Sequence, residues 1–117
     1  MQQLTQLIKP SILLDNTTYK QNFLELARDG KRCALGVIFG DLPGWSLDDH
    51  GGFFHNGKHL FRYVQEMADC LGQSNERIDC PLCMHGDSLL PGIIMHLNDG
   101  HKLSFKEIAI WLRAIGY

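Results

Sequence analysis

The sequence predicts a mainly α fold: a compact single domain of four to five helices, with a Cys-x-x-Cys turn and room for a short two-stranded element near residues 78–97. Three observations favour this class. The chain has 117 residues, a length that suits one domain with one hydrophobic core. Apolar residues recur at helical spacing over residues 58–71. Ser104 and Glu107 form the sequence pattern of a capping box at the start of an apolar final segment, so we expect residues 1–117 to form one helical domain.

The N-terminal third is predicted to hold three helical stretches. Residues 1–10 carry apolar side chains on one helical face and end at Pro10, which indicates a short helix or arm. Residues 15–28 begin with N-capping residue types and precede Gly30, a natural C-terminal stop, so we expect a helix there. Residues 32–39 are apolar nearly throughout, which fits a buried helix or a buried strand, and we favour the helix.

The middle of the chain is predicted to be a long irregular loop followed by the clearest helix. Residues 40–57 hold five Gly, one Pro and three Asp, a composition typical of loops. A loop of this length in a small domain is often functional, which makes it a candidate partner surface. We expect Trp45, Phe53 and Phe54 to pin it to the body of the domain. Residues 58–71 then form the helix, which a glycine ends.

The last third combines a polar turn, an ambiguous apolar stretch and a capped helix. Residues 73–87 are predicted to form a turn around a pair of cysteines. Residues 89–97 are apolar with a Pro-Gly pair inside, which suggests a short strand or a buried connector. The capping box at Ser104 begins a final helix that we expect to be largely buried and to end at Gly116.

The most informative motif is Cys80-Pro81-Leu82-Cys83. Two thiols separated by two residues lie on one side of a tight turn, where one tetrahedral zinc ion can bind both. The remaining ligands would come from histidines further along the chain, and the candidates are His85, His96 and His101. A small domain gains folding free energy from such an ion. Two alternatives stay open: the cysteines are buried as small apolar residues, or they form a redox-active dithiol.

A second polar cluster lies in the segment His96-Leu97-Asn98-Asp99-Gly100-His101. Asp99 and His101 could share a metal ion, or His96 could act as a general base that Asp99 or Asn98 orients. The alternative is a purely structural turn, because Asn, Asp and Gly are residue types that turns favour. The sequence leaves both interpretations open.

Cys33 is a candidate nucleophile. It follows Lys31 and Arg32, and if it begins a helix, the nearby positive charges should lower the pKa of its thiol. The chain order Cys33, His96 and then Asn98 or Asp99 is also that of some thiol hydrolases. The alternative interpretation is a core cysteine beside an apolar run.

Composition and charge exclude several classes of function. The net charge is −2 and no basic face is clustered in the sequence, which argues against a nucleic-acid-binding protein. No run approaches the ~20 apolar residues that a membrane-spanning helix needs, so we expect no membrane span. The N-terminus lacks the features of a secretory signal, so we expect a cytoplasmic protein, in a host cell if the gene is mobile. The four cysteines should be reduced there.

Four segments together resemble a group of small uncharacterised bacterial and phage proteins. They are Arg32-Cys33-Ala34-Leu35-Gly36, Cys80-Pro81-Leu82-Cys83, His96-Leu97-Asn98-Asp99-Gly100-His101 with Ser104 after it, and Ile108-Ala109-Ile110-Trp111-Leu112. The resemblance covers about half of the chain, and Leu103 departs from it, because a Trp precedes the serine in the group. It implies that Cys33 and the segment from His96 to His101 belong to one centre, and that the protein has a phage or mobile-element origin. It implies no activity.

These observations lead to one main expectation about function and two alternatives. We expect a small non-enzymatic accessory factor that binds a protein partner and is stabilised by a zinc or polar centre at the Cys pair and the downstream histidines. The first alternative is a small enzyme, either a thiol hydrolase that uses Cys33 and His96 or a metal-dependent hydrolase that uses His96, Asp99 and His101. The second alternative is a subunit of a larger assembly, because the final helix is strongly hydrophobic.

Overall fold

The computed structural model describes residues 9–23, 27–47, 53–59, 63–71, 77–83 and 89–117. This part of the chain contains five helices and five strands. The helices are α2 (Pro10–Asn16), α3 (Ala34–Phe39), α4 (Tyr63–Cys70), α5 (Leu90–Asp99) and α6 (Phe105–Ala114). The strands are β1 (Ala27–Arg28), β2 (Lys31–Arg32), β3 (Trp45–Leu47), β4 (Phe53–His55) and β5 (Lys58–His59). The prediction of a mainly α fold is therefore wrong, because two small antiparallel sheets accompany the helices.

The first sheet replaces the end of a predicted helix. Strands β1 and β2 pair antiparallel, with Arg28 opposite Lys31. Asp29 and Gly30 connect them with positive φ angles of 52° and 78°. An Asp-Gly pair favours such a two-residue turn, since both of its positions need φ above zero. The helix expected over residues 15–28 is thus wrong in its described part: α2 ends at Asn16, and residues 17–23 are not helical.

The second sheet occupies the region predicted to be a loop. Strand β4 pairs antiparallel with both β3 and β5. The turn between β4 and β5 is Asn56-Gly57, with φ angles of 53° and 81°, again the geometry of a tight hairpin. Trp45 and Phe53 are buried, as expected. These two side chains therefore cannot contribute to the candidate partner surface, which would need exposed side chains. The helix predicted from residue 58 is also wrong at its start, because Lys58 and His59 form β5.

Three helices carry the core. All six residues of α3 are buried, which confirms the helix favoured for that apolar run. Helix α5 covers the apolar stretch predicted to be a short strand or a connector. The proline of this stretch does not prevent a helix, because it lies in the first turn, where a helix tolerates proline well. The predicted two-stranded element near residues 78–97 is for that reason wrong over residues 90–97, which are helical. The capping box of α6 is confirmed: Glu107 N donates to Ser104 Oγ, and Ser104 N donates to Glu107 Oε1.

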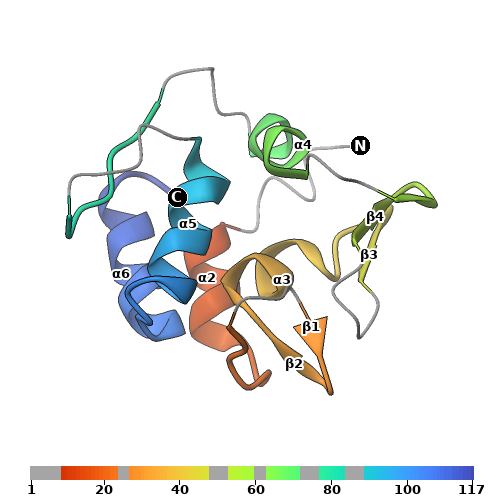
Figure 1. Ribbon diagram of the computed structural model, residues 1–117, viewed down its shortest axis with the longest axis horizontal. Coiled ribbons are helices and arrows are strands. Elements are labelled where there is room, and N and C mark those ends of the chain that lie inside the picture. Colours follow the sequence, from red (N-terminus) through yellow and green to blue (C-terminus); the bar gives the residue numbers. More distant parts are fainter. Residues whose placement is uncertain (1–8, 24–26, 48–52, 60–62, 72–76, 84–88) are drawn as a thin grey trace.

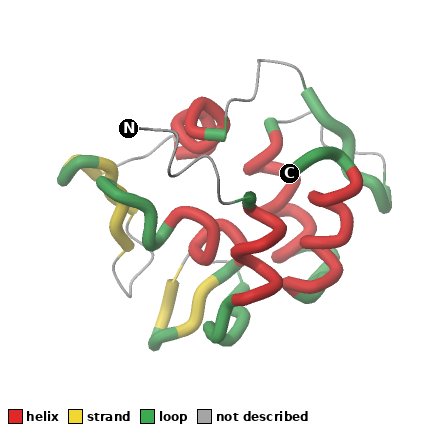
Figure 2. Tube along the Cα trace, turned by 180° about the vertical axis from the view of Figure 1, so that it is seen from behind, coloured by secondary structure: helices red, strands yellow, loops and turns green. Residues whose placement is uncertain are grey.

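The helices α2, α5 and α6 lie together on one side of the molecule, and α3 separates them from the strands β3 and β4 (Figures 1 and 2). The side chain of Arg113 on α6 forms an ion pair with Asp15 on α2. Backbone and side chain of Ser11 both donate to the carbonyl oxygen of Tyr117, which fixes the end of the chain to α2. In the part of the chain that the structure describes, no helix is long and apolar enough to span a bilayer. The short helix or arm predicted over residues 1–10 lies outside the described residues except for its last two.

Candidate metal centre

Four potential metal ligands meet beside the C-terminal end of α5. One ligand atom from each residue lies within 4.8 Å of the other three, and the residues are Cys80, Cys83, His96 and His101. The two cysteines come from the segment 77–83, and the two histidines come from α5 and the link that follows it. Two stretches of sequence that are separate along the chain therefore meet at one point, as the Cys-x-x-Cys motif predicts for a metal site.

The two histidines are brought together by the way α5 ends. The amide groups of Gly100 and His101 both donate to the carbonyl oxygen of His96, at 2.8 and 3.2 Å, which turns the chain sharply back. The two imidazole rings then meet edge to face, with centroids 4.7 Å apart. A Cβ atom on Gly100 would lie 2.9 Å from the carbonyl oxygen of His96 and 3.2 Å from its Nδ1, so this turn needs glycine.

The cysteines lie on a short turn formed by residues 81–83. Cys80 is completely buried, and the amide of Leu82 donates to its sulfur at 3.4 Å. A backbone amide that points at a thiolate lowers the energy of its negative charge, which is a common outer-shell feature of metal–cysteine sites. Cys83 is half-buried, and its sulfur lies 3.4 Å from Nε2 of His96.

These distances fit a zinc ion. Bonds of about 2.3 Å to sulfur and about 2.0 Å to nitrogen, arranged as a tetrahedron, place a sulfur and a nitrogen about 3.5 Å apart and two sulfurs about 3.8 Å apart. The Cys83–His96 separation of 3.4 Å already has that value. The largest separation in the group, at most 4.8 Å, needs to shorten by about 1 to 1.5 Å to reach the tetrahedral distances.

His101 adds an independent indication. Its Nε2 atom is buried and has no hydrogen-bond partner among the described residues. A buried polar atom without a partner costs about 1 to 3 kcal/mol, so proteins seldom leave one unless an ion or another group completes it. The atom belongs to one of the four clustered side chains, where a metal ion would be its partner.

Asn98 and Asp99 do not join this group of four. Asn98 is completely buried, and its amide binds Asp99 Oδ1 at 2.7 Å and the carbonyl oxygen of Asn22 at 2.9 Å. Its oxygen accepts from the amide of Ala34 and from Gln21 Nε2. Both interpretations of the segment from His96 to His101, a metal site and a structural turn, therefore apply to different residues. The two histidines lie with the cysteines in the candidate metal centre, and Asn98 holds the local structure together. Gln21 carried no sequence signal for this role.

Cys33 differs from its sequence-based description. It precedes α3 as the N-cap residue, but it is buried, and this burial raises the pKa of its thiol to about 11, with a smaller contribution from the charge of Asp99. The expected fall in pKa is therefore wrong, because loss of hydration outweighs the backbone hydrogen bonds at Gly36 and Leu35, which favour the thiolate. The hydrogen bond from the amide of Ala34 to Asn98 places Cys33 next to the polar network, but Cys33 is not one of the four clustered ligands.

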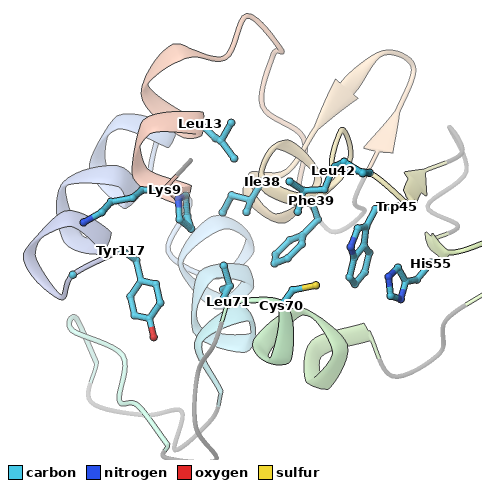
Figure 3. A pocket seen from close by; sticks show the side chains of 13 residues that line it. Lys9, Leu13, Ile38, Phe39, Leu42, Trp45, His55, Cys70, Leu71 and Tyr117 are labelled. Carbon is cyan, nitrogen blue, oxygen red and sulfur yellow. The ribbon is translucent and has the colours of Figure 1, made fainter. Parts of the chain in front are cut away.

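The other predicted ligand, His85, lies outside the described residues. A cavity of about 370 Å³ lies elsewhere, between the start of α2, the end of α3, the strands β3 and β4 and the end of α4 (Figure 3). Polar and apolar atoms contribute almost equally to its walls, and Trp45 and His55 stack at one end with ring centroids 4.2 Å apart. None of the four clustered ligands lines this cavity, so it is separate from the candidate metal centre.

Comparison with known proteins adds no family to this description: no family model, no curated protein and no solved structure matches the chain.

Proposed function

We propose that Cys80, Cys83, His96 and His101 bind one zinc ion, and that this ion has a structural role. The observation that carries the proposal is the convergence of four ligand atoms within 4.8 Å, one of them from His101, whose buried Nε2 has no hydrogen-bond partner among the described residues. Two thiolates and two imidazoles arranged as a tetrahedron are a donor set that zinc favours. Simple burial of the cysteines would not account for two histidines at the same point.

The ligand count supports a structural site over a catalytic one. Catalytic zinc sites keep one position for water or substrate, whereas structural sites have four protein ligands. Here Cys and His side chains supply all four. A bound ion would connect the segment 77–83 to the corner between α5 and α6, and its binding free energy would add to the stability of the fold.

We further propose that the protein is a small non-enzymatic accessory factor that acts by binding another protein, in the reducing environment of the cytoplasm. Both enzyme alternatives lose support. The thiol of Cys33 has a raised pKa, so it is not activated as a nucleophile at neutral pH. Asp99 accepts a hydrogen bond from Asn98 and stands outside the four ligands, which leaves a hydrolase based on His96, Asp99 and His101 without its carboxylate ligand. The resemblance to small bacterial and phage proteins favours an accessory role.

The zinc content of the purified protein tests the metal site. The protein is produced without a histidine tag, and metals are measured by elemental mass spectrometry. We expect about one zinc ion per chain, with strong loss in Cys80→Ser, Cys83→Ser, His96→Ala and His101→Ala. Cys70→Ser is the matched control, because Cys70 is exposed and lies outside the four ligands. Zinc that survives in all four ligand variants, or is absent from the wild-type protein, would contradict the proposal.

A second measurement tests the accessory role. Binding of a protein partner is assayed by cross-linking and co-purification in the producing cells, with Cys33→Ser beside the wild type. A non-enzymatic factor should retain its partner and its biological effect in Cys33→Ser, because that thiol is buried and its pKa is raised. Loss of the biological effect, with the fold and zinc content intact, would favour the thiol-enzyme alternative.

A further inference from the structure

Asn98 lies between the two histidines of the candidate metal centre and is the centre of a buried network of hydrogen bonds. Asn98 lies two residues after His96 and three before His101, on the last turn of α5. Its side chain is completely buried and makes four hydrogen bonds. An amide side chain has two donor hydrogens and an oxygen that accepts two bonds, so its capacity is filled. We propose that Asn98 is a positioning residue of the metal centre, which holds His96 and His101 in the arrangement that binds the ion; this inference rests on the proposed zinc site.

The partners of Asn98 come from three separate places in the chain. Its oxygen binds the backbone amide of Ala34 at 3.1 Å, and its nitrogen binds the carbonyl oxygen of Asn22 at 2.9 Å. The start of α3 and the segment 17–23 are thereby joined to the end of α5. Two of the four partners, the amide of Ala34 and the carbonyl oxygen of Asn22, are backbone groups, so the fold itself sets the position of Asn98 on both its donor and its acceptor side.

Gln21 extends the same support to the far side of His101. Its Nε2 donates to Asn98 Oδ1 at 2.9 Å and to the carbonyl oxygen of Leu103 at 2.7 Å. Asn98 precedes His101 and Leu103 follows it, so one side chain holds the link on both sides of the ligand. The amide of Leu103 also donates to the carbonyl oxygen of Leu97 at 3.0 Å, which closes the link onto the helix. The turn that carries His101 is therefore held by hydrogen bonds within the protein, which lowers the cost of ordering this ligand.

The charge of Asp99 makes the position selective for asparagine. Asn98 Nδ2 donates to Asp99 Oδ1 at 2.7 Å. In Asn98→Asp, a carboxylate oxygen would face the carboxylate of Asp99 and the carbonyl oxygen of Asn22, and both contacts would become repulsive. Asn98→Asp should thus disturb the turn at least as strongly as Asn98→Ala, although it is the closer match in shape.

The test compares zinc affinities by competition with a chromophoric chelator, using the full chain. Outer-shell substitutions at metal sites commonly cost about 10- to 100-fold in affinity. We expect at least about a tenfold loss in Asn98→Ala and Asn98→Asp, with a changed absorption spectrum of the cobalt-substituted protein. Phe53→Leu is the control for general destabilisation, because Phe53 is buried in β4 and Figure 1 places β4 on the opposite side of α3 from α5. It should keep the wild-type affinity and cobalt spectrum.

Each outcome decides one question. Wild-type affinity and spectrum in Asn98→Ala would overturn the positioning role while leaving the zinc site intact. An equal loss of affinity in Asn98→Ala and Phe53→Leu, at matched unfolding midpoints, would also overturn it, since stability alone would then explain the effect. Absence of zinc binding in the wild-type protein would refute the proposed function itself. If the Asn98 variants do not fold, Gln21→Ala gives the answer, because Gln21 is only half-buried and supports the same turn.

Discussion

Replacement of His101 by phenylalanine should change stability in opposite directions with and without metal. The Nε2 atom of His101 is buried without a hydrogen-bond partner among the described residues, and such an atom costs about 1 to 3 kcal/mol. Phenylalanine removes that atom and keeps a ring against His96, whose own ring lies 4.7 Å away edge to face. In the presence of a chelator, His101→Phe should therefore be more stable than the wild-type protein.

The size of the shift follows from the length of the chain. An entropy of unfolding of about 2.1 cal/mol/K per residue converts 1 kcal/mol into about 4 °C for a chain of this size, so Tm should rise by at least about 4 °C in chelator. Zinc acts the other way. Free zinc at 1,000 times its Kd should stabilise the wild-type protein by about 4 kcal/mol, and His101→Phe should lose most of this gain.

Thermal unfolding followed by circular dichroism measures both effects, with EDTA or zinc in otherwise identical buffers. The decisive result is the crossing: the variant should be the more stable protein in EDTA and the less stable one in zinc. A variant that is less stable than the wild type in EDTA would refute the reasoning, because Nε2 of His101 would then have a stabilising partner. An equal zinc response in both proteins would show that His101 is not a ligand.

Four further predictions concern Cys33, the cap of α6 and the turn at Gly57. The thiol of Cys33, with its pKa raised from 9.0 to about 11, should react with iodoacetamide about 100-fold more slowly at pH 8 than an ordinary thiol, as peptide mass spectrometry would measure. Between pH 9 and 11 the unfolded state loses the Cys33 thiol proton, whereas the folded state keeps it. The unfolding free energy of the wild type, measured relative to Cys33→Ala, should therefore fall by about 2 to 3 kcal/mol over this pH range. Ser104→Ala should cost about 1 kcal/mol in urea unfolding, since it removes the cap of α6; a change near zero would mean that water replaces the cap. Gly57→Ala should cost about 1 kcal/mol through its φ of 81° alone, since a Cβ there meets nothing within 4 Å, and an unchanged midpoint would contradict the turn geometry.

The sequence predicted those elements whose signals are local. The capping box fixes the start of α6, because each of its two hydrogen bonds joins residues three apart. The Cys-x-x-Cys turn was predictable for the same reason. The failures have physical causes too. The strands of both sheets are only two or three residues long, too short to show an alternation of apolar and polar residues. The sequence signals for these strands are the turn pairs Asp29-Gly30 and Asn56-Gly57.

Local sequence patterns also could not predict how the four candidate ligands come together. His96 and His101 were among the candidates, but their spacing of five residues is not that of one helical face. They meet because α5 ends between them. That helix was not predicted from the sequence, because the Pro-Gly pair in its first turn was read as a break in the apolar stretch. Asn98 could be recognised as polar and suited to a turn. Its buried position depends on Gln21, Asn22 and Ala34, and no local pattern connects these residues to it.

The distribution of buried residues indicates what the metal contributes to the fold. Helices α3, α5 and α6 supply most of the buried core cluster; of the four candidate ligands, Cys80 belongs to the cluster and Cys83 packs against it. The segment 77–83 has few apolar contacts of its own: Cys80 is buried, Ile78 is half-buried, and Leu82 is 56% exposed. Burial of so little apolar surface cannot offset the entropy of ordering seven residues, at about 1 to 2 kcal/mol each. Removal of zinc should consequently release this segment while the helical core stays folded, in contrast to small zinc fingers, which have almost no core without their metal. The proposed zinc ion would thus connect the segment 77–83 to the corner between α5 and α6, which is where the proposed positioning role of Asn98 lies.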